Sequence, residues 1–326
     1  MNYPACFPRM FHPSLYQGRR RPKKYFEGWY YKHVDPTGKH IYSIIFGVSY
    51  SKDSHSFIQV IEGTQGATDY IRFPLDAFSY DRKQLRVSIG ENTITQDSIS
   101  LNLDGQKFKL SGEIFYRNIS VFPQKVLAPG IMGWYTFAPF MECYHGVVSM
   151  NHQLHGKLKI NGQSLDFTGG KGYIEKDWGK SMPSDWIWLQ CNHFKQSDNA
   201  SMMISIARIP WLTGHFPGFL SFIKIGEKVY RFATYNRSKI SKLEVRTDSV
   251  HMQLVNKKYI LEVDVERKIS GDLKAPVHGD MSRKIAESLD AKLQVKLSQT
   301  AGKVLFESEG EHAGLEIVED VAKYIQ

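Results

Sequence analysis

The stretch from Gly172 to Phe194, GYIEKDWGKSMPSDWIWLQCNHF, decides what kind of protein this chain forms. Two carboxylates, Glu175 and Asp177, lie two residues apart, and an aromatic run follows after a short loop that contains Gly and Pro. In an extended strand, alternate side chains point to the same side. One face of this aromatic strand therefore carries Trp186, Trp188, Gln190 and Asn192. Two indoles and two carboxamides are too polar for a plain core and too aromatic for a plain surface, so this face predicts the wall of a pocket.

Outward from this stretch, the chain consists mainly of short runs rich in aromatic and β-branched residues. Examples are residues 41–50, 56–62 and 98–103, and Asn161-Gly162 is typical of a tight hairpin turn. Helical periodicity is almost absent, and the one convincing helix is predicted over 281–289, with Asp280 as its N-cap. Many short strands joined by tight turns predict an all-β protein built from an antiparallel barrel or sandwich.

A weak internal repeat suggests how these strands are divided. Tyr25-Phe26-Glu27 and the strand after it parallel Tyr173-Ile174-Glu175 and the strand after that, at a separation of about 150 residues, roughly one lipocalin-sized barrel. The repeat predicts two similar barrels, each opened by a Tyr-x-Glu strand. We therefore expect an irregular lead-in over residues 1–24, a first barrel over 25–171 and a second over 172–326.

The composition supports a folded protein with a sizeable core, because 42% of the 326 residues are hydrophobic and 13% are aromatic. No apolar run approaches the roughly 20 residues that a membrane-spanning helix needs. The start of the chain lacks the apolar region of a signal peptide, so we expect a cytoplasmic protein. Three widely spaced cysteines without a CxxC pair argue against a disulfide framework and against a zinc site.

The formal net charge of +9 would suit an anionic partner, and the densest basic cluster runs from Arg19 to Lys24. Two interpretations of this cluster stay open. It is either a solvated loop before the first strand or a peripheral contact with the anionic head groups of a membrane. Nucleic acid is not predicted as a partner, because no nucleic-acid-binding motif accompanies the charge. The sequence does not indicate an oligomeric state.

Three segments carry a resemblance to a known family. The Tyr-x-Glu-Lys-Asp-Trp-Gly run from Tyr173 to Gly179, with the Trp-x-Trp-x-Gln-Cys-Asn-x-Phe run after it, resembles the tocopherol cyclase family. That family is related to the carotenoid hydratases and to pericyclase-like proteins with two lipocalin-like barrels. The run from Tyr25 to Lys32 looks like its N-terminal signature, and Leu273-Lys274-Ala275-Pro276 is similar to the late part of its pattern. The resemblance implies two lipocalin-like barrels in tandem.

The resemblance also implies an activity. The reaction is a cofactor-independent cyclisation, in which a phenol hydroxyl adds across an isoprenoid double bond of the same molecule, so that the enzyme is an isomerase of the intramolecular lyase type. A related isomerase or hydratase acting on another hydrophobic, prenylated substrate belongs to the same class. A lipocalin-like carrier that binds a hydrophobic ligand without chemistry is the alternative.

Protonation of an unactivated alkene needs a strong acid held out of water, and desolvation is what keeps a carboxyl group protonated. Glu175 is the first candidate for this general acid, since related hydratases carry an acidic residue at that position as the proposed proton donor. Asp177 is the second candidate, and His145 could act as a base towards the phenol. The plainer interpretation of Glu175 is an ion pair with Lys176 or with an arginine at the mouth of the barrel. No metal or nucleotide is required by this chemistry.

The remaining candidates would bind the substrate. Aromatic faces stabilise a carbocation, which favours Trp186 and Trp188. Gln190 and Asn192 could hold a phenol or quinol oxygen, because buried amides need hydrogen-bond partners. Further candidates for the pocket lining are Glu27, Trp29, Tyr31 and Glu142.

Overall fold

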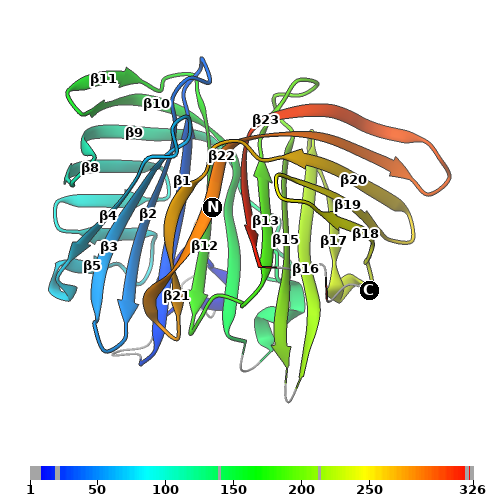
Figure 1. The fold of residues 1–326 in the computed structure, drawn as a ribbon, viewed down its shortest axis with the longest axis horizontal. Helices are drawn as coiled ribbons and strands as arrows, with labels where there is room; N and C mark the ends of the chain where they lie inside the picture. The colour runs from blue at the N-terminus through cyan, green and yellow to red at the C-terminus, as the bar shows by residue number, and fades with distance from the viewer. Residues whose placement is uncertain (1–8, 19–22, 139–140, 212–213, 320–322, 324–326) are drawn as a thin grey trace. The chain divides into compact units, whose positions relative to one another are not determined.

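The computed structural model describes residues 9–18, 23–138, 141–211, 214–319 and 323. Within these residues, strands make up almost all of the regular structure (Figure 1). The helices described are short 3-10 turns, namely η1 (Arg9–Phe11), η2 (Leu75–Ala77), η3 (Gly133–Phe137) and η4 (Thr234–Asn236). The predicted all-β class is confirmed. Among the described residues, no helix is both long and apolar enough to span a membrane.

The first sheet is antiparallel and contains 12 strands among the described residues. Its strands are β1 (Tyr25–Val34), β2 (Ile41–Tyr50), β3 (His55–Glu62), β4 (Thr68–Phe73), β5 (Phe78–Tyr80), β6 (Arg86–Ile89), β7 (Asn92–Thr95), β8 (Ser98–Asp104), β9 (Lys109–Ser120), β10 (Cys143–Ile160), β11 (Gln163–Asp166) and β12 (Lys171–Gly179). They are hydrogen-bonded in the order β4-β3-β2-β1-β12-β10-β9-β8-β7-β6-β5, and β11 pairs with β10.

The second sheet contains 11 strands among the described residues. They are β13 (Trp186–Cys191), β14 (His193–Phe194), β15 (Ser201–Trp211), β16 (Gly214–Ile225), β17 (Lys228–Ala233), β18 (Lys239–Val245), β19 (Ser249–Val255), β20 (Tyr259–Glu266), β21 (Gly271–Val277), β22 (Asp280–Gln299) and β23 (Val304–Val318). Their order is β17-β16-β15-β13-β23-β22-β20-β19-β18, with β14 paired to β23 and β21 to β22.

The chain divides into two compact units, each with a hydrophobic core of its own. The first unit comprises the described parts of Met1–Glu62, Ala67–Met182 and Leu273–Lys284, and the second comprises those of Gly63–Gly66, Pro183–Asp272 and Ile285–Gln326. The fold is that of two lipocalin-like β-barrels in tandem, as the resemblance implied.

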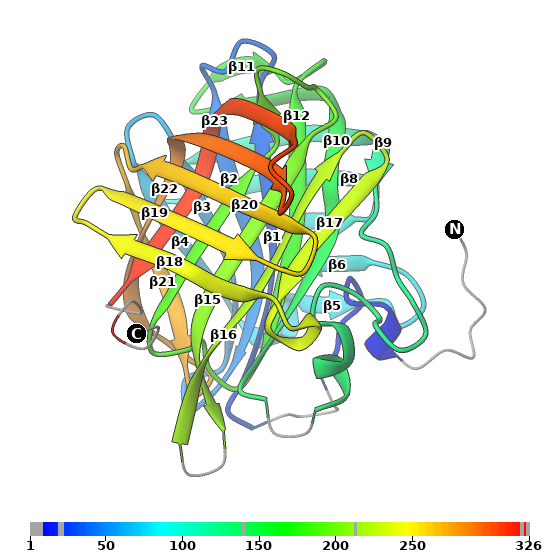
Figure 2. The same cartoon turned by 90° about the vertical axis from the view of Figure 1, so that its right-hand side faces the viewer.

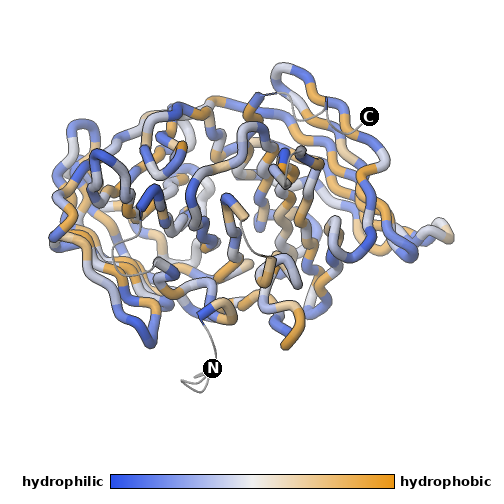
Figure 3. Tube along the Cα trace, turned by 90° about the horizontal axis from the view of Figure 1, so that it is seen from below, coloured by the Kyte–Doolittle hydropathy of each residue, from blue (hydrophilic) through white to orange (hydrophobic). Residues whose placement is uncertain are grey.

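Alternation along the strands builds both cores. In the first unit, Trp29 and Tyr31 of β1 are buried together with Ile44 and Phe46 of β2. In the second unit, the alternate residues Ile187, Leu189 and Cys191 of β13 belong to the core. Figure 3 shows hydrophobic and hydrophilic positions alternating along many of the strands. A repeat of two along the chain is what a sheet with one buried face requires.

Strand β12 lies in the first sheet, where it pairs with β1 on one side and β10 on the other. We expected this strand to open the second barrel at residue 172. Instead the two Tyr-x-Glu strands are antiparallel neighbours, with Tyr31 opposite Ile174 and Lys32 opposite Tyr173. The two halves of the weak repeat therefore meet in one sheet.

The predicted helix over 281–289 is wrong, because these residues form the first half of β22. Ala, Lys, Glu and Leu favour a helix locally, but pairing with the neighbouring strands β21 and β23 overrides that preference. The described cysteines, Cys143 and Cys191, are both free thiols.

Candidate active site

A cluster of polar side chains gathers on one face of β12. Because alternate residues of a strand share a face, Tyr173, Glu175 and Asp177 point the same way. The neighbouring strand β10 pairs His145 directly with Asp177, and side chains of directly paired residues lie on the same face. The sequence predicted that Glu175, Asp177 and His145 take part in catalysis, and the structure brings these three residues together.

Two hydrogen bonds and one longer ion-pair contact link the cluster into a chain. The Nδ1 atom of His145 lies 2.9 Å from Oδ1 of Asp177, and its Nε2 atom lies 3.5 Å from Oε2 of Glu175. The hydroxyl of Tyr173 donates to the same Glu175 oxygen at 2.7 Å. The side chain of Glu175 is 6% exposed and that of Asp177 is 25% exposed. His145 thus bridges a buried carboxylate and a partly accessible one.

The charges of the cluster decide the protonation of His145. Burial alone would lower the pKa of this imidazole, but Asp177 and Glu175 outweigh burial and raise the pKa to about 9. His145 is therefore an imidazolium at neutral pH. Burial, together with the neighbouring Glu175, also raises the pKa of Tyr173 well above its usual value, so its hydroxyl stays a donor.

The same three side chains could also hold a metal ion, since ligand atoms of His145, Glu175 and Asp177 all lie within 4.8 Å of one another. A metal would need a neutral imidazole. Both ring nitrogens of His145 face carboxylates, so a bound cation would have to displace the imidazole proton. The three side chains can therefore hold either a shared proton or a divalent cation.

Lys176 lies on the opposite face of β12 from Glu175, and its partner is Glu27. Both side chains of this pair are fully buried. The carboxylate of Glu27 also accepts hydrogen bonds from the backbone of Gln17 and Gly18, and from the hydroxyl of Tyr25 at 2.7 Å. The plainer interpretation of Glu175, an ion pair with Lys176, is therefore not what the structure shows.

Trp29 and Tyr31 share the core-facing side of β1. The indole of Trp29 donates to the backbone oxygen of Ser14 at 2.8 Å and lies 4.5 Å from the Lys176 ammonium. The hydroxyl of Tyr31 donates to the backbone oxygen of Thr95 at 3.0 Å. The Trp29 contact holds the lead-in segment against the first barrel, whereas the Tyr31 contact lies within that barrel. Contact of the two aromatic residues with a substrate stays a prediction, as it does for Glu27 above.

Residues 142 and 143 border the cluster at the start of β10. The backbone oxygen of Glu142 accepts hydrogen bonds from Lys180 and Ser181, while its side chain is half-buried. The thiol of Cys143 lies 3.9 Å from Oδ1 of Asp177. The sequence did not indicate Cys143 as a site residue, because its proximity to Asp177 depends on the register of β10 against β12.

Four predicted pocket residues are buried but are not members of the second core. Trp186, Trp188 and Gln190 lie in β13, and Asn192 directly follows this strand. This division follows the predicted alternation. The indole of Trp186 donates to the carboxylate of Glu316 on the neighbouring β23 at 2.5 Å. All four belong to the second unit, whereas the acid and imidazole groups belong to the first.

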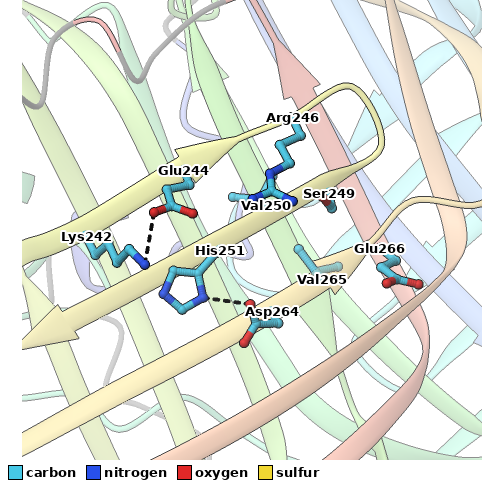
Figure 4. A pocket seen from close by; sticks show the side chains of 9 residues that line it. All are labelled: Lys242, Glu244, Arg246, Ser249, Val250, His251, Asp264, Val265 and Glu266. Atoms are coloured by element: carbon cyan, nitrogen blue, oxygen red, sulfur yellow. Dashed lines mark hydrogen bonds and ion pairs between the residues drawn. The ribbon is translucent and has the colours of Figure 1, made fainter.

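A hollow of about 280 Å³ lies on strands β18 to β20 of the second unit (Figure 4). Its charged side chains pair with one another, Lys242 with Glu244 at 2.9 Å and His251 with Asp264 at 2.6 Å. Such a lining does not suit a hydrophobic ligand. The hollow is therefore not our candidate for the substrate site.

Fold and cluster together define a double lipocalin-like protein with a partly buried acid–imidazole–acid chain. A family model described as tocopherol cyclase-like matches residues 115–318, more than half of the sequence. The chain belongs to the tocopherol cyclase-like family. A segment of 62 residues is 32% identical to the chloroplastic tocopherol cyclase of Zea mays, and it covers 19% of this chain and 13% of that protein's length.

Solved structures of low sequence identity share the fold. Kievitone hydratase from Nectria haematococca matches with a TM-score of 0.54 and 10% identity, over 91% of this chain and 90% of its own. CghA bound to Sch210972 matches with a TM-score of 0.58 and 9% identity, over 90% of this chain and 88% of its own. These structural matches support the double-barrel architecture. At 10% identity or less they do not indicate which reaction the protein catalyses.

Proposed function

We propose that this protein is a cofactor-independent, acid-catalysed cyclase of the tocopherol cyclase type, acting on a hydrophobic prenylated aromatic. The observation that carries the proposal is the partly buried chain of Asp177, His145 and Glu175, with Glu175 at its buried end. It lies in the family's own signature strand and places a protonated imidazole 3.5 Å from a buried carboxylate.

The proton donor to the alkene is Glu175, and His145 supplies its proton. An imidazolium with a pKa near 9 is a weaker acid than a carboxylic acid by about 4 to 5 pH units, so His145 is poorly suited to protonate an alkene directly. Transfer of its proton to Glu175 is uphill by this same difference, about 6 kcal/mol, and it creates the stronger acid in a desolvated position, where burial of the ion pair reduces the cost. Asp177 holds the imidazole in place from the other side.

The reaction then balances without a cofactor. The carboxyl proton of Glu175 adds to the less substituted alkene carbon, which leaves a tertiary cation on the other. The phenol oxygen bonds to that cation and releases its own proton, which returns to the carboxylate–imidazole chain. The net change is an isomerisation. If water attacks in place of the phenol, the same steps give a hydration.

The test compares Glu175→Gln with the wild-type protein on a prenylated hydroquinone. Because the amide has the same shape but cannot donate a carboxyl proton, we expect turnover to fall at least about 100-fold with the fold retained. Glu113→Gln, at an exposed position of β9, is the matched control and should leave turnover unchanged. Cyclisation does not change mass, so chromatographic retention and absorbance must identify the product. Full activity in Glu175→Gln would remove this residue from the mechanism.

A further inference from the structure

The segment over residues 121–138 exposes large apolar side chains. Val126 and Leu127 are 72% and 80% exposed, and Trp134 and Phe137 are 53% and 44% exposed. Single exposed hydrophobic residues are ordinary on a protein surface, but these four, with Val121 at 47% in the same segment, form a concentrated apolar surface. We call these four side chains the apolar tip residues.

The exposure does not come from poor packing of the segment. Backbone hydrogen bonds of 3.0 and 2.9 Å between Lys125 and Ala128 close a two-residue turn, which carries Val126 and Leu127 at its end. On the inner side of the segment, Phe122, Ile131 and Met132 are buried. The backbone is therefore anchored, and the apolar tip residues project from a fixed base.

The anchor lies against the strand of the candidate active site. The backbone N–H of His145 points to the sulfur of Met132 at 3.2 Å, and the hydroxyl of Tyr144 donates to the backbone oxygen of Ala138 at 3.0 Å. The rings of Phe137 and Phe11 lie 6.0 Å apart, which brings η1 beside η3 (Figure 2). The apolar surface is thus attached to β10 at the position of His145.

The two chain segments that meet at this surface carry charge of one sign. Residues 118–141 contain no Asp or Glu, and their single charged residue is Lys125. Residues 1–26 also contain no acidic residue but six basic ones, including Arg9 of η1. Apolar and aromatic side chains bordered by lysine and arginine are what the interface of an anionic bilayer binds.

We propose that this surface docks on an anionic lipid bilayer, with the apolar tip residues in the head-group region and Lys125 and Arg9 facing lipid phosphates. Docking here would bring the strand of His145 close to the phase in which a prenylated substrate dissolves. The inference concerns binding to lipid and holds whether or not the catalytic proposal does.

The test is co-sedimentation of the full chain with vesicles of phosphatidylcholine, alone or mixed with phosphatidylglycerol. We expect binding to the mixed vesicles, and the double variant Val126→Ser/Leu127→Ser should reduce the partition coefficient about tenfold or more. Lys125→Gln should reduce it about fivefold on the anionic vesicles only. Val304→Ser, at a 45% exposed position of β23, is the matched control and should bind like the wild type.

Equal binding by the wild type and the double variant, or no binding of the wild type to anionic vesicles, overturns the proposal. A second copy of the chain is the other candidate occupant of this surface. Sedimentation velocity without lipid distinguishes it, because a dimer that the double variant abolishes would show that the surface is an interface between copies. Unchanged circular dichroism of the variants confirms that the fold is intact.

Discussion

Two buried histidines of the first unit show how one residue type takes opposite protonation states. Burial lowers the pKa of His33 to about 3, and its Nε2 lies 2.8 Å from the Tyr116 hydroxyl rather than from a carboxylate. His145 is also buried, but two carboxylates raise its pKa to about 9. The neighbouring carboxylates, and not burial, keep His145 protonated at neutral pH.

These shifts predict opposite pH dependences of stability. The His145 ion pairs stabilise the fold fully below pH 6.5, and this contribution is lost as the pH rises through about 9. His33 stays neutral in the folded protein but takes up a proton in the unfolded chain below pH 6.5. The free energy of unfolding therefore falls as the pH drops from 6.5 towards 3, by about 2 kcal/mol at pH 5. NMR of the imidazole Cε1–Hε1 groups should find His145 protonated at pH 8 and His33 neutral at pH 5. Titration of both near pH 6.5 would contradict this account.

At the residue level, sequence spacing predicted part of the site. Glu175 and Asp177 had to share a face once their stretch was taken as a strand. The contact of Asp177 with His145 depends on the register of β10 against β12, which spacing along one strand cannot provide. Tyr173 lies two residues before Glu175 and contributed only to the repeat and to the family resemblance, although the same alternation could have placed it in the site.

At the level of elements, the two signature strands β1 and β12 are held together by the buried pair of Glu27 and Lys176. Burial lowers the pKa of Lys176 to about 8, while Glu27 opposes that shift. Lys176 also donates to the backbone oxygen of Leu15. The buried Glu27–Lys176 pair therefore also binds the backbone of the lead-in segment.

Removing one partner of the buried Glu27–Lys176 pair should destabilise the folded protein. Glu27→Gln and Lys176→Met should each lower the free energy of unfolding by about 3–5 kcal/mol, because each leaves a buried charge without its partner. The double variant should lose clearly less than the sum of the two, as urea denaturation would measure. Removing the exposed pair of Asp104 and Lys109 is the control and should change stability little. Strictly additive losses at Glu27 and Lys176 would mean that the pair is not coupled.

Two paired glycines of β1 and β2 should respond differently to an added methyl group. A Cβ at Gly47 would lie 2.1 Å from the ring of Phe57, whereas a Cβ at Gly28 would meet Ile45 at an ordinary 3.7 Å. Gly47→Ala should therefore lower stability by about 1–3 kcal/mol and Gly28→Ala should lower it much less. Thermal unfolding of both variants provides the comparison, and equal melting temperatures would contradict the packing argument.

At the level of the whole molecule, the sequence predicted the all-β class and the tandem barrels but not every strand's place. β12 follows the first barrel's strands in the chain and carries the second Tyr-x-Glu motif, yet it is hydrogen-bonded between β1 and β10. The stretch over 281–289 has helix-forming residues and becomes a strand through its partners. Both outcomes depend on pairing between distant segments, which local patterns do not encode.

The proposed mechanism predicts the source of the hydrogen that is newly bound to carbon in the product. In heavy water, the exchangeable protons of His145 and Glu175 become deuterons, whereas the carbon-bound hydrogens of the substrate do not exchange. The proposed mechanism transfers one of these deuterons to carbon in each turnover.

The most direct measurement is therefore turnover of a prenylated hydroquinone in heavy water, with mass spectrometry and NMR of the product. The account predicts a cyclised product with one deuterium on the former alkene carbon that neighbours the carbon bonded to oxygen. Glu175→Gln should give none of this product. A product without carbon-bound deuterium, or bound substrate that stays unchanged, would contradict acid catalysis by the Asp177–His145–Glu175 chain.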